Sequence, residues 1–274
     1  MFEILGYSFF QNALIAGLLA SIACGVIGTY VVVKRMVSVS GGISHAAFGG
    51  IGLGYYLGID PLLGAVGFAL ATALGLGVLT RRAKQHIDTL IGAVWATGMA
   101  IGIVFIALTP GYAPDLFSFL FGNILLVPAG DLVLMAILVT VILVLVFLLY
   151  TQLMAVTFDE EYATVMNLRV QALSLLLLAL IALTVVMLIR VVGIILVIAL
   201  LTLPAAISRE YTTRLIPMMA WAVLLGTAFS IGGIWLSYLF DIPSGATIIL
   251  TAAAAYAIVL IAKHVPHRIR AAEG

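Results

Sequence analysis

The stretch MVSVSGGISHAAFGGIGLGYYLG, residues 36–58, contains one histidine among small and apolar residues. An ionisable side chain inside a membrane is costly when it faces lipid, so such residues usually face a cavity or a polar partner. The neutral imidazole of His45 can bind a transition metal, and the hydroxyl of Ser44 could add a weak oxygen contact. The alternative is that His45 lies near the membrane interface and only hydrogen-bonds to backbone. One histidine is an incomplete metal site, so further ligands would have to come from other spans or from a second subunit.

Small residues recur at every fourth position of the same stretch, at Gly42, Ala46, Gly50, Gly54 and Gly58. On a helix they form one ladder, the pattern that lets two membrane helices approach backbone to backbone. His45 lies beside this ladder, on a second stripe of small residues. We therefore expect this segment to lie inside a helical bundle. The paired glycines of SVSGG also favour a helix that begins with a break, because glycine permits backbone conformations that helices do not use.

The composition places these residues in a membrane protein. The chain has 274 residues, of which 65% are hydrophobic and 8% charged, whereas soluble domains carry roughly a quarter charged residues. We expect an all-α, polytopic transmembrane bundle, surrounded by lipid and forming a single domain over residues 1–274. A net charge of +1 gives no reason to expect a nucleic-acid partner. Cys24, the only cysteine, cannot form an intramolecular disulfide.

Apolar runs of about 20 residues, the length needed to cross a bilayer, predict nine spans. They lie near residues 11–33, 43–59, 61–80, 88–109, 130–150, 170–189, 192–208, 215–239 and 244–262. The alternative is eight spans, if 43–59 is not a full crossing. Prolines mark two irregular places: the external segment 109–130, which we expect to be re-entrant or interfacial, and Pro204, which should kink its span.

The distribution of basic residues tests the count of nine spans. With nine spans, eleven of the twelve basic residues fall on one side: Lys34, Arg35, Arg81, Arg82, Lys84, Arg169, Arg209, Arg214, Lys263, Arg268 and Arg270. Only Arg190 falls on the other side. The positive-inside rule makes the basic side cytoplasmic. The N-terminus is then outside the cell and the C-terminus inside.

The connection between the fifth and sixth spans predicts a short amphipathic helix at about 158–168. Apolar residues repeat at helical spacing at Phe158, Tyr162, Val165 and Met166, and acidic residues occupy the first turn at Asp159, Glu160 and Glu161. Acidic residues there suit the helix dipole. Such a helix on the cytoplasmic face is a candidate docking element for a partner. The alternative is a helix resting on lipid, which three carboxylates near anionic headgroups disfavour.

Two absences in the sequence bear on the energy source. No lysine follows a glycine loop as Gly-Lys-Ser or Gly-Lys-Thr, so the chain has no phosphate-binding loop of that kind. Nearly all of the eleven acidic residues lie at span ends or in connections, so no chain of buried carboxylates for proton-driven pumping is apparent. We therefore expect a transport subunit rather than an enzyme, with no bound cofactor.

Three stretches together carry a resemblance to a known family: GTYVVVKRMVSVSGGISHAAFGGIGLGYYLG, FDEEYATVMNL, and LLTLPAAISREYTTRL followed by SYLFDIPSGATIILTAAAAY. Along essentially its full length the chain resembles the membrane permease subunit of bacterial and archaeal ATP-binding-cassette (ABC) importers for zinc, manganese or iron, the ABC-3 family. The resemblance implies a fold similar to the vitamin B12 importer permease without its first span. It also implies a homodimer in the cell (inner) membrane, two cytoplasmic ATPase subunits that bind the ATP, and an external metal-binding protein.

The resemblance also assigns roles to particular residues. Asp159 to Leu168 would be the coupling helix that fits a cleft in the ATPase, and His45 matches a Ser-His pair for which a role in the metal path is proposed. Many members, notably manganese importers, have an aspartate four residues before that histidine, where this chain has Gly41. The missing oxygen ligand weakens the case for manganese and favours zinc as the transported ion. The expected mechanism is alternating access. The alternative is a stand-alone secondary metal transporter or channel.

Overall fold

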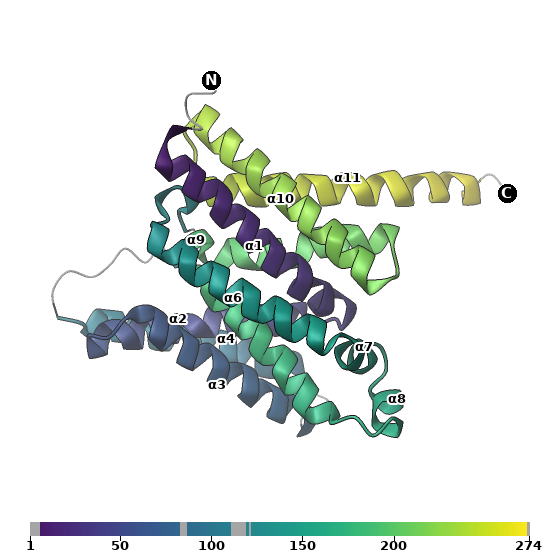
Figure 1. Ribbon diagram of the computed structural model, residues 1–274, viewed down its shortest axis with the longest axis horizontal. Helices are drawn as coiled ribbons and strands as arrows, with labels where there is room; N and C mark the ends of the chain where they lie inside the picture. The colour runs from purple at the N-terminus through teal and green to yellow at the C-terminus, as the bar shows by residue number, and fades with distance from the viewer. Residues whose placement is uncertain (1–5, 83–86, 111–118, 121, 273–274) are drawn as a thin grey trace.

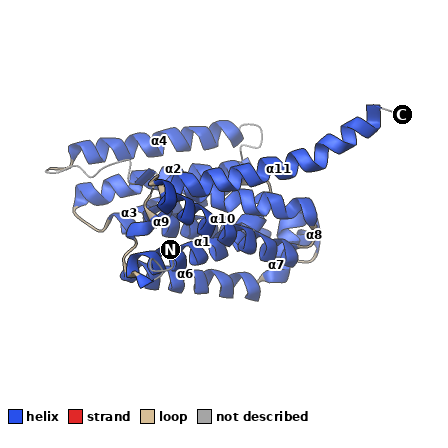
Figure 2. Ribbon diagram, turned by 90° about the horizontal axis from the view of Figure 1, so that it is seen from above, coloured by secondary structure: helices blue, strands red, loops and turns tan. Residues whose placement is uncertain are grey.

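The computed structural model describes residues 6–82, 87–110, 119–120 and 122–272. Every regular element among them is a helix (Figure 2). The elements are α1 (Ser8–Val33), α2 (Val37–Leu57), α3 (Pro61–Arg82), α4 (Ile87–Leu108), the short η2 (Ile124–Leu126), α6 (Ala129–Leu148), α7 (Tyr150–Phe158), α8 (Glu160–Val165), α9 (Val170–Tyr211), α10 (Leu215–Phe240) and α11 (Ser244–Ala272). This confirms the all-α, polytopic fold class.

Eight helical stretches among the described residues are long and apolar enough to cross a membrane, and each corresponds to one predicted span. The remaining predicted span is α2. Its 21 residues extend about 30 Å at roughly 1.5 Å per residue, comparable with the thickness of a bilayer core. Its many glycines and serines make it less apolar than the others. Since 14 of its residues are buried by neighbouring helices, α2 has little need of a lipid-compatible surface.

The expectation that α2 begins with a break is wrong. The helix is continuous from Val37: the Ser40 amide donates to the Met36 carbonyl at 3.0 Å in the helical pattern, and the Ser44 hydroxyl donates to the Ser40 carbonyl at 2.9 Å. The paired glycines therefore adopt helical backbone here, and the close packing described below accounts for their small size.

The break in the helical backbone lies instead within α9. Gly193 has φ 77° and ψ 162°, and it lies near the start of the second of two membrane-length stretches, Val170–Ile189 and Val191–Tyr211. Non-helical angles are recorded at Gly193 and not at Pro204, where we expected a kink. Gly122, with φ 62°, lies directly against the backbone of Val192 and Gly193. The segment 109–130, which we expected to be external, thus contacts α9 at its break through Gly122, although residues 111–118 and 121 of that segment lie outside the described ranges.

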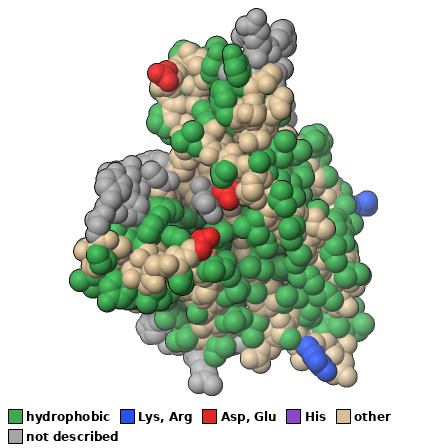
Figure 3. Space-filling view, turned by 60° about the vertical axis from the view of Figure 1, so that its left-hand side comes forward, with side chains coloured by type: hydrophobic (Ala, Val, Ile, Leu, Met, Phe, Trp, Pro, Cys, Tyr) green, Lys and Arg blue, Asp and Glu red, His purple; other side chains and the backbone are tan. Residues whose placement is uncertain are grey.

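The helices pack around α9, which contacts α1, α2, α3, α6, α10 and α11 (Figure 1). On one side of it, α2 packs most extensively with α4 and α3; on another, α1 packs against α10. One face of the molecule, shown in Figure 3, is dominated by hydrophobic side chains with few charges, as a lipid-facing surface requires.

We call the end of the bundle at which α1, α9 and α11 end the basic end, because Lys34, Arg209 and Lys263 lie there. The short helices α7 and α8 lie at the same end, next to the last turn of α1 (Figure 1). Two ion pairs also lie there, Lys34–Glu160 and Lys263–Glu210.

Candidate functional site: the His45 wall and the exposed helix α8

Glycines let α2 approach its neighbours at backbone distance. A Cβ atom at Gly54 would lie 2.7 Å from the Pro61 Cα atom of α3, and one at Gly50 would run into the Gly64 carbonyl oxygen. On the α4 side, a Cβ atom at Gly42 would lie 3.0 Å from the Ile91 Cγ2 atom, and one at Gly98 would lie 2.5 Å from the Ala46 Cα atom.

The ladder turns from one neighbour to the other along α2. Each step of four residues advances about 40° around an α-helix, so Gly42 and Ala46 face α4 while Gly50 and Gly54 face α3. Gly58 differs from the predicted role: a Cβ atom there would meet nothing within 4 Å, and with φ 67° this glycine caps the helix in the left-handed conformation. Glycine serves there because it has no Cβ atom to oppose that conformation.

Replacing Gly50 by leucine should therefore destabilise the bundle. The opposing atom is a backbone carbonyl oxygen, which cannot rotate away, and overpacking typically costs about 1–3 kcal/mol. Thermal unfolding of the purified, detergent-solubilised protein should show a lower midpoint for Gly50→Leu. Gly67→Leu in α3 is the matched control, since a Cβ atom at Gly67 meets nothing within 4 Å. Equal midpoints for the two variants would contradict close packing at Gly50.

His45 lies inside the bundle with 8% of its surface exposed. Its ring stacks on the Trp95 side chain of α4, with ring centroids 3.9 Å apart and planes 15° apart, and its Nδ1 atom lies 3.1 Å from the Met99 Sδ atom. Trp95 is itself 38% exposed. The imidazole of His45 is thus covered by the Trp95 side chain, and the other parts of Trp95 are exposed at the outer surface of α4.

Gly41 lies one helical turn before His45 on α2 and faces the same Trp95 side chain. A Cβ atom at Gly41 would lie 3.5 Å from the Trp95 Cζ3 atom and 3.8 Å from the Ile198 Cδ1 atom, both ordinary van der Waals distances. We refer to Gly41, His45, Trp95 and Met99 as the His45 wall. Ser44 is not part of it, because this buried hydroxyl donates to its own helix.

The donor chemistry of the His45 wall is an imidazole nitrogen and a thioether sulfur. Within the described residues, no three His, Cys, Asp or Glu side chains are grouped as a metal site. The sequence pattern singled out His45 but not Trp95 or Met99. Those two residues follow it by 50 or more positions and repeat no motif, so only the packing of α2 on α4 brings them together.

The short helix predicted at about 158–168 is present as α8, Glu160–Val165, and is preceded by a separate helix, α7, that ends at Phe158. Asp159 adopts an extended conformation, φ −152°, which ends α7 at Phe158. Its carboxylate then accepts the amides of Glu161 and Tyr162, each at 2.9 Å, and so caps α8. Aspartate is a favoured N-cap residue, and the acidic first turn is therefore present as predicted.

The outer side of α8 exposes apolar side chains. Val165 is 84% exposed, and Phe158, Met166 and Tyr162 are each more than half exposed, whereas Ala163 faces inward and is fully buried. A groove of about 520 Å³ lies between α7 and α8, and Met154, Phe158, Tyr162, Met166 and Leu168 are among the residues that line it. Several neighbouring apolar side chains without cover usually mark an interaction site.

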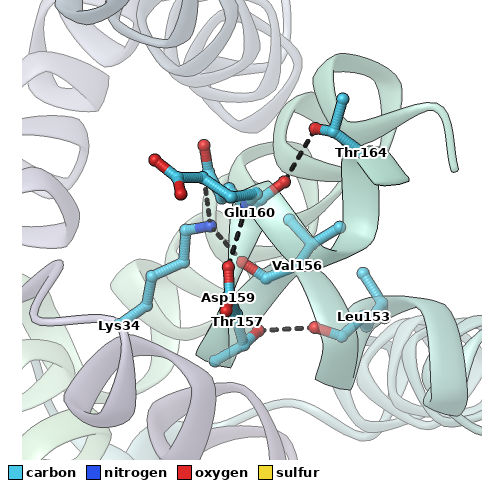
Figure 4. Close-up of polar contacts among 8 residues, drawn as sticks. Lys34, Leu153, Val156, Thr157, Asp159, Glu160 and Thr164 are labelled. Carbon is cyan, nitrogen blue, oxygen red and sulfur yellow. Dashed lines mark hydrogen bonds and ion pairs between the residues drawn. The ribbon is translucent and has the colours of Figure 1, made fainter. Parts of the chain in front are cut away.

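The three acidic residues have different surroundings. The Asp159 carboxylate caps the N-terminus of α8, and the Glu160 carboxylate accepts a hydrogen bond from the Lys34 ammonium at 2.7 Å (Figure 4). The side chain of Glu160 is 49% exposed and that of Lys34 only 15%. Two of the carboxylates that the sequence pattern grouped together are thus used within the chain.

Comparison with known proteins shows what this architecture is. The profile of the ABC 3 transport family matches residues 6–263. An uncharacterized membrane protein of Synechocystis is 54% identical over 95% of this chain and 92% of its own length. A protein of Halalkalibacterium halodurans named as a manganese transport system membrane protein is 35% identical over 93% of this chain and 88% of its own.

Solved structures agree with the sequence comparison. A chain of PsaBC from Streptococcus pneumoniae, solved in complex with a Fab, is similar with a TM-score of 0.83 and 32% identity, over 93% of this chain and 91% of that one. The resemblance seen in the sequence is confirmed. The chain belongs to the ABC 3 transport family and is a membrane permease of the ABC type.

Proposed function

We propose that the protein is the permease subunit of an ABC importer that moves a divalent transition metal ion into the cytoplasm by alternating access. The observation that carries this proposal is α8, a short helix whose apolar side chains lack cover at the basic end. A permease without its own ATPase needs such a docking element. Relatives named as metal transport proteins support a metal ion as the cargo.

In this proposal the basic end faces the cytoplasm, as the positive-inside rule predicts. α8 and the groove beside it fit the partner ATPase, which binds ATP. The opposite end, where α1 begins and the Gly122 contact lies, receives the external metal-binding protein. A second copy of the chain completes the translocation path, since the His45 wall of one copy offers only one nitrogen and one sulfur donor.

His45 is proposed as a transient ligand on the path of the ion. A site with few ligands is suited to transport, because an ion must bind strongly enough to enter and weakly enough to leave. The donor atoms of the His45 wall favour one metal and the names of relatives favour another. Imidazole and thioether donors without a carboxylate suit zinc better than manganese, whereas several relatives are named as manganese transporters. We propose zinc, with manganese as the second candidate.

Metal accumulation in cells tests the proposal. Metal-starved cells would express the ATPase and the binding protein of the same organism with wild-type permease, His45→Ala, or no permease. Zinc, manganese and iron would then be measured by elemental mass spectrometry. We expect permease-dependent accumulation of one metal that His45→Ala removes at equal membrane abundance.

Two other results would lead to different conclusions. Accumulation that survives His45→Ala would keep the importer but remove His45 from the path. Permease-dependent accumulation without the ATPase would contradict the ABC mechanism and favour a stand-alone transporter.

A further inference from the structure

Lys34 joins the coupling region to the end of α1. Its ammonium donates to the Glu160 carboxylate of α8 at 2.7 Å and to the Val156 carbonyl of α7 at 2.9 Å (Figure 4). One side chain therefore holds both short helices, on either side of the break at Asp159. A cation at the carbonyl end of α7 is also favoured by the helix dipole, and the low exposure of the Lys34 side chain, 15%, limits screening by solvent.

The chain leaves Lys34 through a tight turn. The Met36 amide donates to the Val31 carbonyl at 2.8 Å and the Arg35 amide donates to the Val32 carbonyl at 3.2 Å. With Arg35 at φ 57°, this is the Schellman arrangement that closes a helix end. The Ser40 amide then donates to the Met36 carbonyl at 3.0 Å, so α2 begins directly after the turn with no unbonded linker between the two helices.

The same turn is tied to a second helix. Arg209, near the end of α9, donates from Nη1 to the Val32 carbonyl at 3.2 Å. The last turn of α1 is thereby braced by α9 on one side and by α7 and α8 on the other. A displacement of α8 at this corner would reach α2 through Lys34 and the two residues of tightly bonded backbone that follow it, Arg35 and Met36.

We propose that Lys34 is the positioning residue that transmits movement of α8 to α2, and so couples ATP hydrolysis to the His45 wall. The inference rests on the proposed function, because it takes α8 as the ATPase-docking element. It goes further by identifying the contact through which docking reaches the metal path. The direct covalent connection of α8 runs to α9, through Asn167 and Arg169, and not to the helix that carries His45.

This role predicts a loss of coupling without a loss of assembly. The Lys34 side chain is only 15% exposed, whereas the apolar side chains offered for docking on α8 are more than half exposed, so Lys34→Met should bind the ATPase as wild type does. With both contacts of the ammonium removed, α8 would move without carrying the α1–α2 corner. We expect the amount of metal imported per ATP hydrolysed to fall by about fivefold or more, the lower range of typical coupling between sites.

The experiment uses proteoliposomes that contain the permease, its ATPase and the external binding protein, with radioactive zinc and manganese as probes. ATP hydrolysis and metal import are measured in the same vesicles, and ATPase binding is measured by co-purification. Lys263→Met is the matched control, since Lys263 also bridges two helices at the basic end, contacting the Glu210 carbonyl and carboxylate. Lys263→Met should keep the wild-type ratio, and Lys34→Arg, which keeps the charge and the donors, should recover most of it.

Several results would overturn the inference. A wild-type ratio in Lys34→Met would remove Lys34 from the coupling path, and equal losses in Lys34→Met and Lys263→Met would indicate a general charge effect. If Lys34→Met does not fold, Glu160→Ala removes the Lys34 contact to α8, and an unchanged ratio there has the same meaning. A wild-type complex that neither binds the ATPase nor imports metal would instead refute the proposed function itself.

Discussion

Replacing Val165 by lysine is expected to prevent the permease from binding its ATPase while leaving the permease folded. Val165 is 84% exposed, and substitutions at such surface positions usually change stability by less than about 0.5 kcal/mol. As the last residue of α8, position 165 also suits a cation, because positive charge is favourable at a helix C-terminus. The helix should therefore persist.

The substitution costs binding free energy only when the ATPase covers the outer face of α8. Burying a valine side chain is worth about 1.5–3 kcal/mol, and its loss corresponds to roughly a 10- to 150-fold weaker association. An ammonium placed on that face without a partner adds the cost of a buried, unpaired charge. Tyr162→Lys should act in the same way, since Tyr162 is 55% exposed on the same helix and lines the groove beside it.

The measurement is titration of the purified permease with the ATPase in nanodiscs, without the external binding protein. Leu126→Lys is the control: Leu126 is 76% exposed, but it lies in η2 between α4 and α6, at the end opposite α8. Leu126→Lys should bind the ATPase as wild type does. Equal affinities for wild type and for both α8 variants would mean that the ATPase docks elsewhere.

How much of this structure follows from the sequence can be judged helix by helix. The apolar spans were predictable because each must satisfy its backbone within lipid, which demands a long run of apolar residues. The polar and small residues of α2 were informative for the same reason: a helix with serines, glycines and a histidine inside a membrane bundle has to be buried, and most of α2 is. The capped start of α8 was likewise local, since an aspartate before an acidic turn is a cap signal.

Other features depend on contacts between distant segments. The break in α9 lies at Gly193, and the backbone of Gly122 fits against it from a different part of the chain. Glu160 belongs by pattern to an acidic docking surface, yet its carboxylate bonds Lys34, 126 positions earlier. No local rule distinguishes Glu160 from Glu161, so their different roles became visible only in the fold.

Gly41→Asp is expected to shift the preference of the transporter toward manganese. Positions 41 and 45 are one turn apart on α2, so their side chains lie on the same face of the helix. A Cβ atom at Gly41 meets its neighbours only at 3.5 and 3.8 Å, so the backbone and the packing admit a side chain. An aspartate there would place a carboxylate beside the imidazole of His45. Carboxylate oxygen suits manganese, whereas imidazole alone suits zinc.

A roughly tenfold rise in the ratio of manganese to zinc accumulated is the expected size, equivalent to about 1.4 kcal/mol of differential binding. The measurement is competitive uptake of both metals by metal-starved cells that express the complete transporter. Gly41→Asn is the control, because it fills the same space with a neutral side chain and should keep the wild-type ratio. The double variant Gly41→Asp with His45→Ala should import neither metal, since import is expected to need the imidazole of His45. An unchanged ratio in Gly41→Asp, with import intact, would mean that the ion does not pass along the His45 wall, and the interior face of α2 would then serve packing alone.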